Sequence, residues 1–241
     1  VRGFLAYMLA HPGKKLMFMG SELGQFDEWN STEQLQWNLL GYEKHRQLNH
    51  FFATANKFYC DTPAMHENDY DWNGFQWIAL DDYKHSIISF RRIAYDGSEV
   101  IVVCNFQPML RENYKIGVPK FGIYKEVLNS EAEEFGGCGI VNEGELKAQD
   151  AADHDLPYSI NITLAPLSVI YIELDKELPA PEPKKKKTTN RKAAALKKAK
   201  AEKAAKAESK AEEKTDEKPV VEENEETKET KAEEKVETVE E

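Results

Sequence analysis

The chain has 241 residues, with 32 basic and 43 acidic side chains and a formal net charge of −11. All of that net charge lies in residues 1–178, because residues 179–241 carry 17 basic and 17 acidic side chains. An acidic body is poorly matched to a phosphate backbone, so we expect no nucleic-acid partner. The apolar runs reach about five residues, far short of the roughly 20 that span a bilayer, so we expect no membrane span.

The cysteine spacing and the short sequence motifs exclude several kinds of site. Cys60, Cys104 and Cys138 are unevenly spaced and form neither a disulfide framework nor a zinc knuckle. Without a recognisable secretory leader, this pattern indicates reduced thiols and a cytoplasmic protein. Cys104 lies in an apolar run and is interpreted as an inert buried thiol. We find no phosphate-loop or metal-ligand spacing, and therefore expect no cofactor and no metal.

The first 62 residues follow a helix, strand, helix pattern. Apolar pairs at Phe4, Leu5, Met8 and Leu9 are typical of the end of an amphipathic helix, so we expect the chain to begin in mid-domain. After a break at 11–13, the four-residue apolar run 16–19 predicts a buried parallel strand. A second helix is predicted over 42–59.

From residue 74 onward the pattern changes to short β-runs separated by turn residues. The alternation in 159–164 predicts an antiparallel strand with Ile160, Ile162 and Leu164 facing inward. Asp96 and Gly97 form the clearest hairpin signal. Seven strands are predicted, which together indicate a β-sandwich: 75–80, 85–93, 99–106, 113–118, 124–128, 159–164 and 167–174.

The last part of the chain has a low-complexity composition. Three alternating prolines from Pro179 predict a stiff linker, and the residues that follow are mainly Lys, Ala and Glu. Too few large apolar side chains are present there to offset the entropy of ordering, so a disordered tail is predicted. We interpret it as a solubilising or weak electrostatic tether, with an interaction arm as the alternative. The predicted domains are thus 1–62, 63–178 and 179–241.

The loop after the predicted strand is the candidate site. In α/β barrels, function lies at the carboxyl ends of the strands, which is where Glu22, Gln25, Glu28 and Trp29 are expected. Carboxylates and amides bind sugar hydroxyls, and an indole can cover the apolar face of a pyranose. The alternative is that these side chains only hold a long loop in place.

Two acidic pairs suggest a second kind of site. Glycoside chemistry uses two carboxyl groups on opposite sides of the bond, and the pairs Asp69/Asp71 and Asp81/Asp82 could supply them. Because both pairs lie in polar, turn-like stretches, we interpret them instead as solvated turn carboxylates.

Several stretches resemble one enzyme family. Residues 11–25, followed by Glu28, Trp29 and Asn30, resemble the eighth barrel strand and loop of the 1,4-α-glucan (glycogen) branching enzymes of the α-amylase superfamily. Residues 63–69 and 74–78 resemble that family's passage into its C-terminal β-domain, and 102–108 and 164–168 fit the same domain. Ser21 departs from the family pattern, in which many members have Asn.

The resemblance implies an α/β part followed by an all-β part. The chain would hold the last strand and flanking helices of a (β/α)8 barrel, then an antiparallel β-sandwich. The family cleaves an α-1,4 glucan bond through a covalent glycosyl-enzyme and transfers the chain to a 6-hydroxyl. Its catalytic carboxylates lie on earlier strands, so no catalytic residue is assigned here and the chain alone is expected to be inactive.

The partners implied are an α-glucan and the missing N-terminal part of the barrel. Two alternatives remain open: the end of an α-glucan hydrolase of the same superfamily, and a non-catalytic glucan-binding or packing module. The preference for a transferase over a hydrolase depends mainly on residues 63–78.

Overall fold

The structure is a computed structural model that describes residues 1–181. These residues lie in one compact unit, which is the part considered below. Nearly all of the predicted tail lies outside the described residues. The tail's disorder and its role therefore stay predictions, as do the domain boundaries drawn from the sequence.

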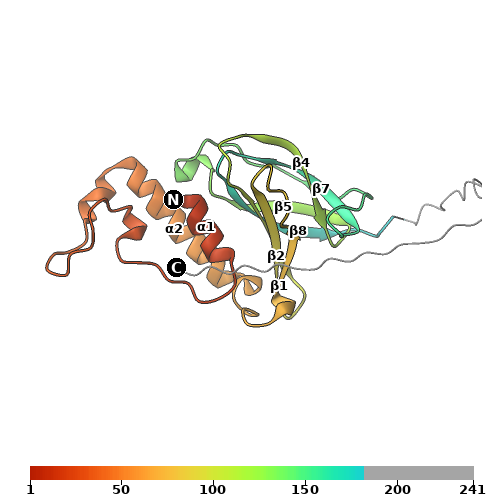
Figure 1. Cartoon of the computed structure of the whole chain (residues 1–241), viewed down its shortest axis with the longest axis horizontal. Helices are drawn as coiled ribbons and strands as arrows, with labels where there is room; N and C mark the ends of the chain where they lie inside the picture. Colours follow the sequence, from red (N-terminus) through yellow and green to blue (C-terminus); the bar gives the residue numbers. More distant parts are fainter. Residues whose placement is uncertain (182–241) are drawn as a thin grey trace, which may run out of the picture. The chain divides into compact units, whose positions relative to one another are not determined.

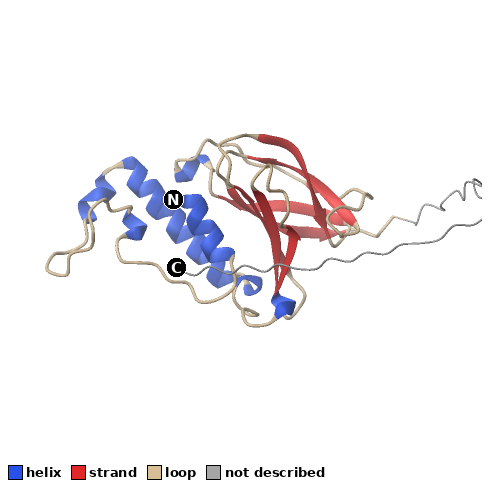
Figure 2. Cartoon of the chain, viewed as in Figure 1, coloured by secondary structure: helices blue, strands red, loops and turns tan. Residues whose placement is uncertain are grey.

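Two helices lie side by side against a β-sheet (Figures 1 and 2). They are α1 (Arg2–Ala10) and α2 (Glu43–Asp61), and both confirm helices expected from apolar spacing. In α2 the buried side chains are Phe51, Phe52 and Ala55, a spacing that puts them on one face. Thr62 ends the helix, and Pro63 follows in a short 3₁₀ turn.

The remaining elements form two antiparallel sheets. The larger has the strand order β1-β2-β3-β8-β5-β6, and the smaller pairs β4 with β7. Seven of these strands match the predicted ones, and only the two-residue β6 was missed. The strands are β1 (Phe75–Ala79), β2 (Ile87–Ile93), β3 (Glu99–Asn105), β4 (Arg111–Val118), β5 (Gly122–Asn129), β6 (Leu146–Lys147), β7 (Tyr158–Leu164) and β8 (Val169–Glu177).

Strand β3 separates two hydrophobic cores. Val100, Val102 and Cys104 belong to the core that also holds the buried side chains of α1 and α2. Ile101 and Val103 belong to the other core, between the large sheet and the β4–β7 sheet. A strand buried on both faces has no polar positions to alternate with, which explains its continuous apolar sequence. The predicted sandwich is confirmed, with the helices covering its outer face.

The predicted strand at 16–19 is wrong for the described structure. These residues are irregular, and Leu16 and Phe18 are 87% and 61% exposed. A parallel strand needs neighbours to complete its hydrogen bonds, and no described strand lies beside this run. The barrel is accordingly not evident within residues 1–181.

Candidate functional site

A groove of about 760 Å³ lies between α1 and the loop that follows residue 17. Its apolar wall includes Phe4, Phe18 and Phe52. Its polar wall includes Gln25 and Glu28, and Trp29 also lines it. The structure therefore brings three of the four predicted site residues together.

These three side chains differ in how firmly they are held. The Trp29 indole is 44% exposed and contacts the Phe18 ring edge-on, with centroids 5.9 Å apart. The Gln25 amide donates to the carbonyl of Asp27 at 3.1 Å and accepts from the backbone N–H of Gln36 at 3.3 Å. Glu28 is exposed. The groove thus offers an apolar ring face beside a free carboxylate and a positioned amide.

Glu22 has a different position. Its carboxylate Oε2 accepts the backbone N–H of Gly20 at 3.1 Å, and Glu22 is not among the residues that line the groove. Gly20 has φ +89°, a conformation that favours glycine. By accepting from the Gly20 N–H, the Glu22 carboxylate closes a tight turn at this position. In this structure Glu22 holds the loop, while its predicted contact with substrate stays untested.

A second cleft, of about 420 Å³, lies between the end of α1 and strand β1. Tyr70 and Trp72 in its wall are 82% and 89% exposed, and Trp77 is 42% exposed. The Trp77 ring packs edge-on against Phe75 at 4.9 Å, which fixes its orientation. Sequence reasoning did not identify this cleft, although the aromatic and acidic residues crowded into 69–77 were a usable signal.

Asp69 lies in the same cleft and corrects an expectation. It was interpreted as a solvated turn carboxylate, but its side chain is only 6% exposed and forms an ion pair with the fully buried Arg92. Arg92 also donates to the carbonyl of Ala10 at 2.8 Å. The pair therefore ties the end of α1 to strand β2. Asp71 is exposed, as expected, and caps the short turn at 72–74.

Lys15 lies near this ion pair, and its pKa is lowered. Its ammonium group is 5.3 Å from the centroid of the Tyr59 ring and donates to the carbonyl of His11. Burial lowers the pKa of Lys15 to about 8, with Asp69 acting in the opposite direction and Arg92 adding to the decrease. Asp69, in the cleft wall, and its partner Arg92 thus influence the protonation of Lys15, in the segment that follows α1.

The described part of the chain, residues 1–181, has neither clustered metal ligands nor an apolar helix of membrane-spanning length. No group of three or more His, Cys, Asp or Glu side chains in that range is arranged to hold a metal ion. Neither described helix is long and apolar enough to cross a membrane. Cys104 is buried, and burial raises the pKa of its thiol well above its usual value, as expected for an inert group.

Comparison with known proteins shows which proteins this chain resembles. Residues 77–175 match the family described as alpha amylase, C-terminal all-beta domain. Over 177 residues the chain is 43% identical to the 1,4-alpha-glucan branching enzyme GlgB of Synechocystis sp., covering 73% of this chain and 23% of that protein. Over these residues the chain is similar to the branching enzymes.

Two further relatives support the same assignment. The branching enzymes of Halothermothrix orenii and Aquifex aeolicus are 46% and 44% identical over 174 residues, covering 72% of this chain and 28% of theirs. The chain thus spans about a quarter of the length of the branching enzymes that it matches. The resemblance seen in the sequence is confirmed at the level of the family.

Proposed function

We propose that the chain functions as the C-terminal part of a 1,4-α-glucan branching enzyme in glycogen synthesis. The intact enzyme would cleave an α-1,4 glucan chain and transfer it to a 6-hydroxyl. The observation that carries the proposal is the identity of 43–46% over 174–178 residues, a length that exceeds the matched β-domain at 77–175. The catalytic carboxylates would lie on the remaining polypeptide.

The exposed apolar residues near the groove support this proposal. Leu16 and Phe26 are 87% and 84% exposed, and Phe18 and Met19 are 61% and 53% exposed. Such a concentration of exposed apolar side chains is unusual for a self-sufficient surface. Packed against the rest of a (β/α)8 barrel, residues 16–19 would gain strand neighbours and become its last strand.

Substrate contacts follow from the groove residues. Trp29 would cover one face of a glucose unit, while Gln25 and Glu28 would bind its hydroxyl groups. The reaction would be retaining, because a covalent intermediate inverts configuration twice. No residue of this chain is assigned a step at the reacting bond, and no cofactor is required.

The test uses an intact chimera. Residues 1–178 of this chain would replace the matching segment of the Synechocystis enzyme, and amylose would be the substrate. We expect the chimera to lower iodine absorbance and to create α-1,6 linkages, and the free 241-residue chain to do neither. An inactive chimera would contradict the proposal. New reducing ends without α-1,6 linkages would instead favour the hydrolase alternative.

A non-catalytic glucan-binding function is the second candidate, and the cleft at Tyr70 and Trp72 favours it. Exposed rings beside the Asp71 carboxylate offer both stacking and hydrogen bonding to a sugar chain. Retention on immobilised glycogen should fall in W72A. The matched control is Y83A, because Tyr83 is 80% exposed but does not line the cleft. Equal retention of both variants would leave only a packing function.

A further inference from the structure

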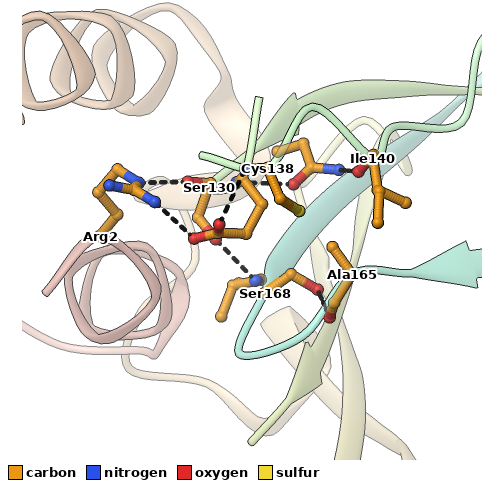
Figure 3. Close-up of polar contacts among 9 residues, drawn as sticks. Arg2, Ser130, Cys138, Ile140, Ala165 and Ser168 are labelled. Carbon is orange, nitrogen blue, oxygen red and sulfur yellow. Dashed lines mark hydrogen bonds and ion pairs between the residues drawn. The ribbon is translucent and has the colours of Figure 1, made fainter. Parts of the chain in front are cut away.

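Lys15 lies in the segment that leaves α1, and both ends of that helix are attached to the sheet domain. Figure 3 shows Arg2 reaching toward Ser130, whose carbonyl accepts from Arg2 Nε at 2.6 Å. This bond attaches the beginning of α1 to the segment that follows β5. At the other end, the Ala10 carbonyl accepts from the buried Arg92 of β2 at 2.8 Å. Lys15 therefore follows a helix whose position is defined.

The Lys15 side chain returns to the end of α1. Its ammonium group donates to the carbonyl of His11, the residue after the Ala10 carbonyl that binds Arg92. Two cationic groups thus bind carbonyls of consecutive residues, at a helix end that favours positive charge. The ammonium group also lies over the Tyr59 ring of α2, 5.3 Å from its centroid. The Lys15 nitrogen is therefore positioned by contacts with α1 and α2.

This position lacks a free counter-ion for Lys15. Within residues 1–181 Lys15 has no ion pair of its own, since the Asp69 carboxylate binds the fully buried Arg92 instead. Two cationic side chains and one anionic side chain therefore share a partly buried site, which leaves a surplus positive charge. Burial and the repulsion from Arg92 disfavour the charged amine, and Asp69 only partly offsets them. The surroundings thus favour an uncharged group at Lys15.

The same site contains a buried donor without an acceptor. The Arg92 side chain is 0% exposed, and its two Nη atoms donate to the Ala10 carbonyl and to Asp69. Its Nε has no hydrogen-bond partner within residues 1–181. A buried N–H without an acceptor is unfavourable, and an ammonium group brings only further donors to the site. A carbonyl oxygen attached to the Lys15 nitrogen would instead bring an acceptor.

We propose that Lys15 is a site of N-acylation by an acyl phosphate. The neutral amine attacks the acyl carbon, the bond from that carbon to the phosphate oxygen breaks, phosphate leaves, and the nitrogen releases one proton to water. The amide product is uncharged, keeps one N–H for the His11 carbonyl and adds one acceptor oxygen. Lys15 is partly exposed, so a small donor can reach it, and the exposed Lys14 beside it attracts an anionic donor.

The test incubates the full 241-residue chain with acetyl phosphate at pH 7.5 and measures each acetylated lysine by peptide mass spectrometry. Lys15 should react about tenfold faster than Lys14, because more of an amine with a lowered pKa is neutral at that pH. Lys14 is the matched control, since it is adjacent in the chain and exposed, and meets the same concentration of donor. The rate at Lys15 should level off above about pH 8.

The unfolded chain supplies the second measurement. In urea the contacts with His11 and Tyr59 are lost, and Lys14 and Lys15 should react at equal rates. Equal rates in the folded chain would overturn the proposal. A faster reaction at Lys15 that persists in urea would also overturn it, because the local sequence and not the folded site would then be the cause. The test uses no glucan, so its result is independent of the proposed function.

Discussion

Removing the Asp69 carboxylate tests how the helices are joined to the sheet. The Arg92 and Asp69 side chains are 0% and 6% exposed, so D69A would leave a guanidinium buried without its counter-ion. Arg92 Nε already has no hydrogen-bond partner within residues 1–181, and in that part of the chain the bond to the Ala10 carbonyl would be the only hydrogen bond left to the guanidinium. Breaking a buried pair from one side costs about 3–5 kcal/mol. For a domain of this size that lowers Tm by about 6–20 °C.

Urea unfolding of the full chain, followed by tryptophan fluorescence and circular dichroism, measures this loss. The control is D175A, because the pair between Lys125 and Asp175 is 2.6 Å long but about half exposed on both sides. Exposed pairs contribute little, so the control should barely shift the midpoint. The double variant R92M/D69L removes both charges and should recover much of the stability. A D69A loss as small as that of D175A would refute this reasoning.

Three further predictions concern the described part of the chain. A thiol reagent at pH 8 should label Cys60 and Cys138, which are exposed, but not Cys104 until the protein unfolds; fast labelling of all three thiols would contradict its burial. F51A should cost about 3–5 kcal/mol in urea unfolding, because Phe51 is fully buried and packs edge-on against Phe135 at 5.2 Å. Burial raises the pKa of Glu173, so the folded state keeps this proton above the unfolded pKa and loses stability as the pH rises through the folded pKa. E173Q should therefore be more stable than the wild type at pH 7 but not at pH 3. Equal dependence of unfolding free energy on pH in the two proteins would refute the shift.

The all-β part could be predicted from sequence because its signals are local. The alternation of Ile160, Ile162 and Leu164 needs only a strand with one buried face, and all three are buried. The run around Cys104 needs only a strand buried on both faces. Turn residues then separate one strand from the next, so the predicted boundaries of the seven strands agree with the structure to within three residues.

The errors concern properties that depend on distant residues. The apolar run at 16–19 has the composition of a buried strand, but a strand also requires neighbours, and none lies beside it in residues 1–181. Asp69 was placed in solvent because its partner, Arg92, is 23 positions away on a strand whose facing side could not be known. The second cleft was missed for the same reason, since it forms only when α1 ends beside β1.

The burial of β3 on both faces has a consequence for recombining branching enzymes. Val100, Val102 and Cys104 share a core with α1 and α2, and Ile101 and Val103 share one with β4 and β7. A crossover placed at the 62/63 boundary would pair the helices of one parent with the sheet of another and create mismatched packing along the whole strand. Gene exchange should therefore carry α1, α2 and the sandwich together as one inherited block, with the junction before residue 1.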